Sequence, residues 1–219
     1  MAVLTERLRE SAPTPERILD AARAVFAERG FDGASTREIA ARAEVNISSL
    51  HYHWDSKETL YLAVLERIYQ PLVDLVQAEL EAAAGSADPV AAVERAMGRT
   101  FDFFVEDRTL PKLLMRRLID PVGPDAERER GVLGPAWRTF MEWVVRFSPG
   151  PVAEADLQFF TLAVGSVLLA SMLDGTAAHA LVGGDLVDPA VRSRLRSRLI
   201  DLVKALLHID GARNGKGAA

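Results

Sequence analysis

Apolar residues recur at helical spacing along almost the whole chain, and no segment alternates convincingly between apolar and polar residues. After Pro15, five apolar residues share one helix face: Ile18, Leu19, Ala22, Val25 and Phe26. The sequence therefore predicts an all-α protein. Further helices are predicted from Thr36, over 47–53, from a Ser56 cap to Ala84, and over 89–106, 110–119, 125–147, 153–182 and 188–208. Pro71 lacks an amide and should kink the helix that contains it.

The composition excludes several classes of protein. The 219 residues are 49% apolar and 26% charged, carry a formal charge of -5 and include no cysteine, as in an ordinary globular protein. Without cysteine there is no disulfide framework and no thiolate nucleophile. The first residues lack the apolar segment of a signal peptide, and the longest apolar run, 162–173, is shorter than the ~18–20 residues that span a bilayer. We expect a cytoplasmic protein with no membrane partner.

No motif for catalysis, a cofactor or a metal ion is visible. The chain has no G-x-S-x-G, Walker or G-x-G-x-x-G pattern. His51 and His53 are two residues apart on a predicted helix, so they point about 200° from each other and cannot hold one metal ion together. His179 and His208 are isolated in the sequence. The sequence predicts a protein that is not an enzyme and needs no cofactor.

Two short predicted helices, joined by a tight turn, follow the first helix. Ser35 to Glu38 has the S-x-x-E form of a capping box, which starts one helix at Thr36. Residues 44–46 form the turn, and Asn46 can cap the second helix. Braced by a helix on either side, this pair has the spacing of a helix-turn-helix, whose second helix enters the DNA major groove. The spacing is weak evidence alone, because many all-α proteins contain such a pair.

A longer match lies over the stretch from Thr14 to Leu65. It contains the segments ILDAARAVFAERGFDGAS, TREIAARAEVN and SSLHYHWDSKETLYLAVL. These resemble, in order and spacing, the N-terminal domain of the TetR family of transcriptional repressors, with its patterns T-x-x-x-I-A-x-x-A-G-V-S, x-G-x-L-Y-x-Y-F and x-x-K-E-x-L. Four residues depart from the usual glycine, glycine, tyrosine and phenylalanine of those patterns: Glu44, Ser48, His51 and Trp54. A residue other than glycine at position 44 is strained if the turn requires a positive φ.

The resemblance implies contacts with double-stranded operator DNA for ten residues: Thr36, Arg37, Asn46, Ile47, Ser48, Ser49, His51, Tyr52, His53 and Lys57. Within this set, Thr36 and Lys57 would contact phosphates, and Arg37 would reach a phosphate or a base edge. Residues 47–49 would face bases, and the two histidines would lie near the backbone. The side chains suit these roles, because hydroxyls donate and accept hydrogen bonds and arginine can bind guanine with two.

The predicted DNA-binding head, residues 14–57, is not basic. It contains six lysine and arginine residues against seven aspartate and glutamate residues. Non-specific DNA affinity grows with the number of phosphates that a protein neutralises. We therefore expect modest non-specific binding, and specificity that depends on a dimer placing two recognition helices on the DNA.

Nine of the fifteen aromatic residues lie beyond residue 100. They either form plain core or line a cavity, and the TetR resemblance implies a cavity for a small-molecule effector in the C-terminal helices. The candidate lining residues are Phe104, Met115, Trp137, Phe140, Met141 and Phe160. Few polar residues accompany them, which favours a hydrophobic effector.

The predicted helix from Ala155 to Leu173 is apolar on nearly all sides, which a surface helix of one small domain rarely requires. We expect one side to face its own core and the other a second subunit, with the last helix supplying a companion stripe and four helices forming a two-fold interface. The resemblance implies the same homodimer. Candidate interface residues are Val164, Val167, Leu168, Leu195, Leu199, Leu202 and Leu206. Arginines 192, 194, 196 and 198 fit a solvated face better than a second nucleic-acid patch.

These patterns predict four segments: a flexible N-terminus (1–13), the helix-turn-helix domain (14–57), a helical ligand-binding and dimerisation domain (58–210) and a disordered tail (211–219). The predicted function is a ligand-responsive homodimeric regulator, a repressor that binds a palindromic operator and is released by a small hydrophobic effector. The alternative is a helical small-molecule binding protein with a vestigial DNA-binding head, which the non-basic head favours.

Overall fold

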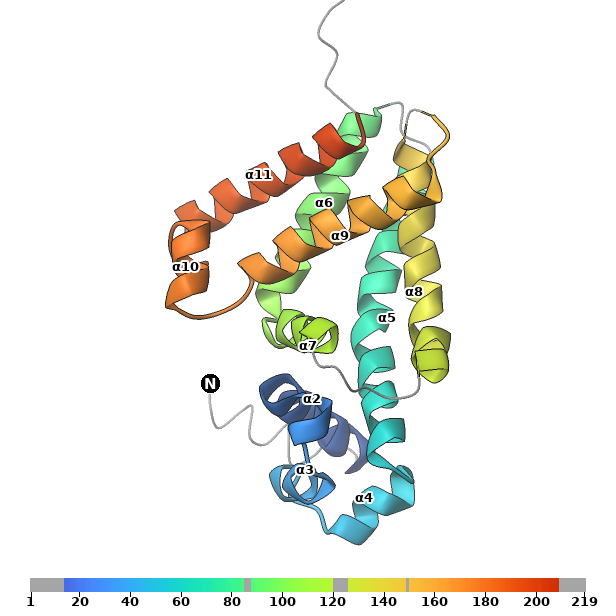
Figure 1. The fold of residues 1–219 in the computed structure, drawn as a ribbon, viewed down its shortest axis with the longest axis vertical. Coiled ribbons are helices and arrows are strands. Elements are labelled where there is room, and N and C mark those ends of the chain that lie inside the picture. The colour runs from blue at the N-terminus through green and yellow to red at the C-terminus, as the bar shows by residue number, and fades with distance from the viewer. Residues whose placement is uncertain (1–13, 85–87, 120–125, 149, 209–219) are drawn as a thin grey trace, which may run out of the picture. The chain divides into compact units, whose positions relative to one another are not determined.

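A computed structural model describes residues 14–84, 88–119, 126–148 and 150–208 (Figure 1). These residues form ten α-helices and no strand, so the predicted all-α fold class is confirmed. The helices are α2 (Thr14–Gly33), α3 (Thr36–Arg42), α4 (Ile47–His53), α5 (Lys57–Ala84), α6 (Pro89–Glu106), α7 (Thr109–Ile119), α8 (Ala126–Phe147), α9 (Glu154–Ser171), α10 (Thr176–Val182) and α11 (Pro189–Leu206). The segments predicted to be flexible or disordered at the two termini lie outside the described residues.

Three helices begin at the caps that the sequence predicts. The Ser35 hydroxyl accepts a hydrogen bond from the Glu38 amide at 3.1 Å, at the start of α3. The Asn46 side chain accepts one from the Ser49 amide at 2.6 Å, at the start of α4, and the Ser56 hydroxyl accepts one from the Thr59 amide at 3.1 Å before α5. Each cap satisfies an amide that the first turn of a helix leaves without a partner.

Two stretches of helix are interrupted at glycines. α2, which runs to Gly33, is kinked at Gly30, where φ is 71° and ψ is 179°, a conformation that only glycine adopts without strain. The helix predicted over 153–182 is two helices, because the chain turns at Gly175, where φ is 119°. As predicted, α5 is one helix, from Lys57 to Ala84, with Pro71 inside it; a kink at Pro71 stays a prediction.

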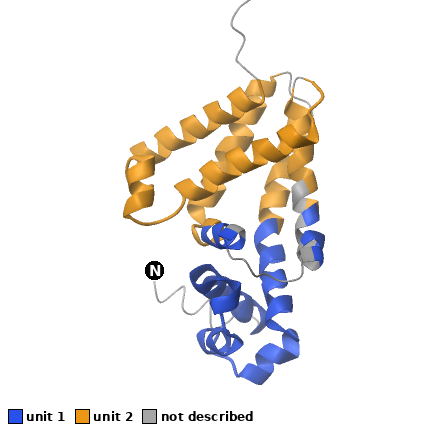
Figure 2. Cartoon of the chain, viewed as in Figure 1, with its two compact units in different colours: residues 1–69, 112–134 blue, residues 70–111, 135–219 orange. Residues whose placement is uncertain are grey.

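The chain divides into two compact units (Figure 2): a first unit of residues 1–69 and 112–134, and a second unit of residues 70–111 and 135–219. The first unit has a core between α2, α3, α4 and the start of α5, with these residues fully buried: Ile18, Val25, Phe26, Ile39, Leu50, Leu60 and Leu65. The rings of Phe26 and Tyr61 meet edge to face at 5.0 Å. From α7, the Arg116 guanidinium donates hydrogen bonds to the carbonyls of Ala27 (3.1 Å) and Glu28 (2.6 Å). This unit positions the α3–α4 pair.

In the second unit, α11 packs against both α6 and α9. The absence of a side chain at Gly98 of α6 lets the Arg196 guanidinium of α11 lie directly on the helix, where its Nε is 3.5 Å from the Asp102 carboxylate. On α5 the Glu79 carboxylate is buried and pairs with Arg95 (2.8 Å) and Arg99 of α6. A buried carboxylate needs such partners, so the two arginines hold α5 and α6 together.

Two kinds of functional feature are missing from the described segments. No single helix in them is long and apolar enough to cross a membrane; α9 and α10 reach that composition only as a pair, bent by 120° at the break between them. Nor do these segments bring three or more histidine, aspartate or glutamate side chains together in a way that could hold a metal ion.

Candidate nucleic-acid interface

The turn between α3 and α4 is closed by backbone hydrogen bonds and buried side chains. The amide of Glu44 donates to the Ala41 carbonyl at 3.1 Å, and the amide of Val45 donates to the Ala40 carbonyl at 3.0 Å. This pair of bonds is the Schellman motif, in which the residue at the position of Glu44 adopts a left-handed conformation. Behind the turn, Ile39 of α3 and Leu50 of α4 are fully buried, so the two helices are held in one arrangement.

The outer face of α4 is polar and solvent-exposed. Ser48, His51 and His53 are exposed, and Tyr52 is 84% exposed. The Tyr52 ring lies edge to face with the neighbouring His53 ring at 5.1 Å. The other predicted DNA-binding residues of this region are placed differently: Thr36, Ile47 and Ser49 are half-buried, and exposed Asn46 uses its side-chain oxygen for the cap of α4.

The arginines of the head divide into paired and unpaired side chains. The Arg29 Nε lies 3.1 Å from Glu38, and the Arg42 Nη1 lies 2.9 Å from Glu28, so both pairs join α2 to α3. The hydrogen bond with Arg42 lowers the pKa of the Glu28 carboxyl, and the same bond raises the pKa of the Arg42 guanidinium; the pair stays ionised at neutral pH. Arg37, at the start of α3, is exposed and makes no hydrogen bond or ion pair with the residues that the structure describes.

Together, the start of α3 and the outer face of α4 present a guanidinium, hydroxyls, imidazoles and a phenol on one compact unit. These groups can donate hydrogen bonds to phosphate oxygens and to the base edges of the major groove. The major groove is about 12 Å wide and admits an α-helix such as α4. The chemistry of this surface therefore suits double-stranded DNA.

Comparison with known proteins finds relatives of the head in sequence and of the chain in fold. Residues 18–64 match the family of bacterial regulatory proteins of the tetR type. The chain is 33% identical over 99 residues to the transcriptional repressor NicS of Pseudomonas putida and 39% identical over 98 residues to the transcriptional activator FasR of Mycolicibacterium smegmatis. A protein from Shewanella sp. PV-4 described as a TetR-family transcription regulator has the same fold, with a TM-score of 0.66 and 18% identity over 87% of this chain and 98% of that one. Residues 18–64 therefore form a helix-turn-helix head of the TetR family.

The match to the two curated relatives spans 45% of this chain and of NicS, and 43% of this chain and of FasR. The family-model match covers α2 from Ile18, all of α3 and α4 and the start of α5. The shared sequence is therefore centred on the helix-turn-helix. The likeness to the Shewanella protein, at 18% identity, is one of fold.

Lys57, the predicted phosphate contact of this TetR-family head, lies against the head itself. Its ammonium donates hydrogen bonds to the carbonyls of Phe31 (2.8 Å) and Ala34 (3.2 Å), and it lies 4.5 Å from the centre of the Phe31 ring. These contacts fasten the start of α5 to the end of α2 and to the residue that follows it. A phosphate contact by Lys57 stays a prediction, and it would require the ammonium to leave these carbonyls.

Replacing Lys57 with methionine should lower the free energy of unfolding by about 1.5–3 kcal/mol, because the carbonyls lose hydrogen bonds to a charged group. The methionine keeps an apolar stem of similar length, so the loss reports the ammonium. Urea denaturation at one protein concentration measures the change. Arg37→Met removes a cation that has no partner in the described structure, so it should change the same quantity by less than about 0.5 kcal/mol. Equal losses in the two variants would contradict the role of the Lys57 ammonium in fastening α5 to the head.

Glu44 adopts the left-handed conformation that its place in the Schellman motif demands, with φ 56°. The family's usual glycine has no side chain to strain there, whereas an L-residue in this conformation costs about 1–2 kcal/mol. Glu44 also places an exposed carboxylate immediately before α4. The turn therefore has its left-handed residue at a cost in stability and with a negative charge beside the candidate interface.

Replacing Glu44 with glycine should raise the free energy of unfolding by about 0.5–1 kcal/mol, the strain relieved less the extra freedom of glycine in the unfolded chain. The same change should strengthen DNA binding, because a negative charge beside the phosphates is lost. Urea denaturation and a DNA titration measure the two effects. Glu44→Gln separates them, since it removes the charge and keeps the strain: it should strengthen DNA binding without stabilising the fold.

The predicted effector residues fall in both units. Phe104 and Phe160 are buried in the second unit, where the rings of Phe140 and Phe160 lie 6.1 Å apart. Met141 is half-buried in the same unit, and Met115 is half-buried in the first. The side chain of Trp137 lies outside the described structure. A cavity lined by the full set stays a prediction.

The predicted dimer residues divide between the inside and the outside of the second unit. Val164, Leu168 and Leu199 are buried in its own core, and Leu195, Leu202 and Leu206 are half-buried on α11. Val167 lies on the outer stripe of α9, which we define as Phe159, Leu162, Ala163, Ser166, Val167 and Ala170. Phe159 and Leu162, which the sequence did not single out as interface residues, are 62% and 64% exposed. Phe159 is three residues before Leu162 and eight before Val167, and these helical spacings were the signal for a shared outer face.

Proposed function

We propose that this chain is a homodimeric transcriptional regulator that binds double-stranded operator DNA through α3 and α4. The observation that carries the proposal is the free polar surface of the helix-turn-helix: Arg37 has no partner among the described residues, and Tyr52 is 84% exposed. A fold that needed these side chains for its own stability would have paired or buried them. Thr36 and residues 47–49 complete the proposed contact surface.

A palindromic operator follows from the proposed dimer. Two copies related by a two-fold axis present two recognition helices, and each helix reads one half-site when the half-sites lie about 34 Å apart, one turn of DNA. The outer stripe of α9 supports the dimer, because exposed apolar surface of this extent marks an interface. Because the head is not basic, it gains little affinity from phosphates, and a second recognition helix is needed for tight binding.

We propose that the regulator is a repressor that a small apolar effector releases. The aromatic side chains of the second unit, with the Phe140 and Phe160 rings 6.1 Å apart, supply apolar surface of the kind that lines ligand pockets. An effector that binds better to a dimer geometry with mismatched recognition helices lowers DNA affinity by the difference between its two binding free energies. NicS is named a repressor and FasR an activator, so the sign of regulation needs its own measurement.

The first experiment is a titration of the purified protein against DNA from its own upstream region, at about 100 mM salt with specific and scrambled competitor. Specific retention supports the regulator, and release by apolar compounds then identifies the effector class. Transcription from the same promoter in vitro, with and without protein, separates repression from activation.

The second candidate function is a helical small-molecule binding protein whose head no longer binds DNA. The observation that favours it is the pairing of Arg29 with Glu38 and of Arg42 with Glu28, which removes two cations from any contact with phosphates. Under this alternative the protein shows no specific retention at micromolar concentration on its upstream DNA, yet binds apolar ligands.

A further inference from the structure

The segment that contains α10 is held at both of its ends by one arginine of the second unit. The Arg108 guanidinium, at the corner between α6 and α7, lies 2.9 Å from the Asp174 carboxylate and 3.8 Å from the Asp185 carboxylate. These two aspartates flank α10 in the sequence. Met172 and Leu186, which also flank it, are 0% and 2% exposed. Both ends of the segment are therefore fixed to the unit by contacts outside α10.

Glycines with a positive φ lie between these fixed ends and α10. Gly175 has φ 119° on one side, and Gly183 and Gly184 have φ 77° and 139° on the other. Glycine adopts such conformations without the steric cost that a side chain brings. Hinges in proteins are residues at the ends of an element that absorb a change in backbone angles. The chain can therefore turn at both ends of α10.

α10 itself adds little to the stability of the unit. It has seven residues, fewer than the roughly 12–15 that a helix needs to persist alone in water. None of the seven, all of which the structure describes, is buried, and the side chain of Leu181 is 87% exposed. Gly175, at the N-cap, supplies no side-chain hydrogen bond. A segment with so few buried contacts opens locally, without unfolding of the whole unit.

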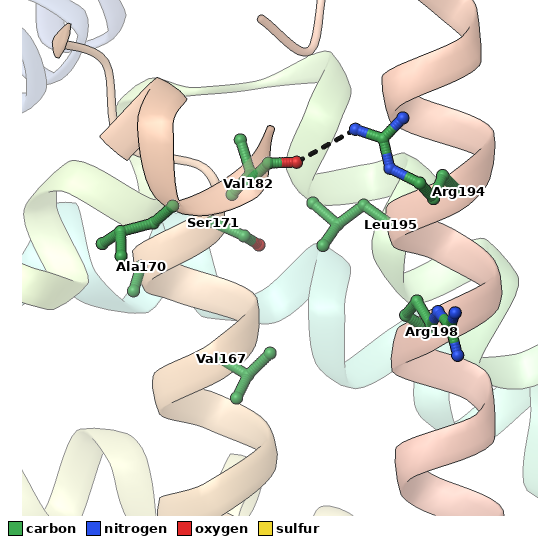
Figure 3. Close-up of a pocket in the computed structure, with 8 residues that line it drawn as sticks. Val167, Ala170, Ser171, Val182, Arg194, Leu195 and Arg198 are labelled. Atoms are coloured by element: carbon green, nitrogen blue, oxygen red, sulfur yellow. Dashed lines mark hydrogen bonds between the residues drawn. The ribbon is translucent and has the colours of Figure 1, made fainter. Parts of the chain in front are cut away.

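A charged side chain of α11 binds the C-terminal end of α10. Arg194 donates hydrogen bonds to the carbonyls of Val182 (3.2 Å) and Gly183 (3.0 Å) (Figure 3). The last carbonyls of a helix lack partners within it and carry partial negative charge, so they suit a guanidinium. The Nε2 atom of His179 in α10 adds no hydrogen bond, because it lies 4.0 Å from Asp185 and has no partner among the described residues. Arg194 is therefore the latch of α10.

An open groove of about 370 Å³ lies between α9, α10 and α11, beside this latch. Its lining is mainly apolar and includes Val167 and Ala170 of α9, Val182 of α10 and Leu195 of α11 (Figure 3). α10 is thus a wall of the groove, although none of its own residues is buried. When α10 moves away, the apolar sides of α9 and α11 that line the groove become open to solvent.

We propose that α10 is a flap over this groove. To open, it detaches from the Arg194 latch, turns at the glycines on either side and loses its helix, while Arg108 keeps the ends of the segment in place. The closed flap is the state that the structure describes. Opening breaks the hydrogen bonds of one arginine and exposes little apolar surface, so it requires far less free energy than unfolding of the unit. The flap controls access to the space between α9 and α11, and it does not depend on the proposed DNA contacts.

Hydrogen exchange of the full chain, followed by mass spectrometry at increasing urea concentrations, measures this opening. The amides of residues 179–183 should exchange at least about 100-fold faster than those of α9 and α11, at a rate that urea hardly changes, because a local opening exposes little surface. Arg194→Met removes the latch and should accelerate this exchange about tenfold. Arg198→Met is the matched control, since Arg198 lines the same groove but is exposed and makes no hydrogen bond or ion pair within the described parts of the chain; it should leave the exchange unchanged.

Arg108→Met tests the fixed ends of the segment. Without its guanidinium, fast exchange should extend from α10 into residues 172–175, and unchanged exchange there would contradict the role of Arg108. Circular dichroism checks that each variant keeps its helical content. If α10 of the natural protein exchanges at the rates of α9 and α11, with the same dependence on urea, it unfolds only with the unit and the flap is overturned. An Arg194→Met variant that exchanges no faster than Arg198→Met overturns the latch.

Discussion

Arg37→Ala is expected to weaken specific operator binding at least about 30-fold, because an arginine that binds a base edge with two hydrogen bonds contributes about 1–3 kcal/mol and the dimer contains two of them. The loss should arise almost wholly in the complex, since Arg37 has no partner in the described part of the free chain. Fold and dimer formation should therefore stay unchanged. A DNA titration with operator and scrambled competitor measures both affinities.

The salt dependence of this variant separates two roles for Arg37. If it contacts only phosphate, specific and non-specific affinity fall together, and the slope of log K against log salt drops by about two per dimer. If it reads a base, specific affinity falls more than non-specific affinity. Arg29→Ala is the matched control, since Arg29 is already paired with Glu38; it should change operator affinity by less than about threefold. Equal losses in the two variants would contradict the special role of Arg37.

Leu162→Glu is expected to abolish the dimer at micromolar concentration and, with it, specific operator binding. Leu162 is 64% exposed in the single chain, so glutamate costs the isolated subunit little. In the proposed dimer the same side chain is covered, and burial of an unpaired carboxylate costs several kcal/mol for each of the two subunits. A single head then reads one half-site, and affinity falls by about 1000-fold or more, toward non-specific binding.

Val145→Glu is the control for the Leu162→Glu prediction. Val145 of α8 is 51% exposed and lies outside α9 and α11, so the new carboxylate stays in water and the dimer persists. Sedimentation equilibrium, helical content and operator titration are compared for the two variants. A Leu162→Glu protein that remains dimeric and binds operator normally would place the interface elsewhere.

The local signals of the sequence predicted the head well. The caps Ser35, Asn46 and Ser56 depend on residues within three positions of each other, so they are visible in sequence and are found as hydrogen bonds. The strain at Glu44 could also be predicted from the sequence, because a non-glycine residue stands where the TetR pattern usually has the turn glycine. The arginine pairs were not, since Arg42 and Glu28 are fourteen residues apart and meet only when α3 packs on α2.

Long-range packing explains what sequence patterns could not assign in the second unit. α9 is apolar on both sides, so periodicity alone could not tell the core side, with Val164 and Leu168, from the outer stripe. The break before α10 was missed because the apolar pattern continues past Gly175, and only its φ of 119° shows the turn. Lys57 has the motif position of a phosphate contact, yet its carbonyl partners lie more than twenty residues earlier in the chain.

The two arginine–glutamate bridges between α2 and α3 bear on how such a protein distributes itself along a chromosome. A cell offers about 10⁶–10⁹ competing sites, and a strongly cationic head spends most of its time on them. A head in which two of the five arginines are bound to carboxylates of the neighbouring helix leaves a larger share of molecules free in solution. If the chain is the proposed regulator, fewer copies then suffice to occupy one operator, and a released molecule is less readily held on neighbouring DNA.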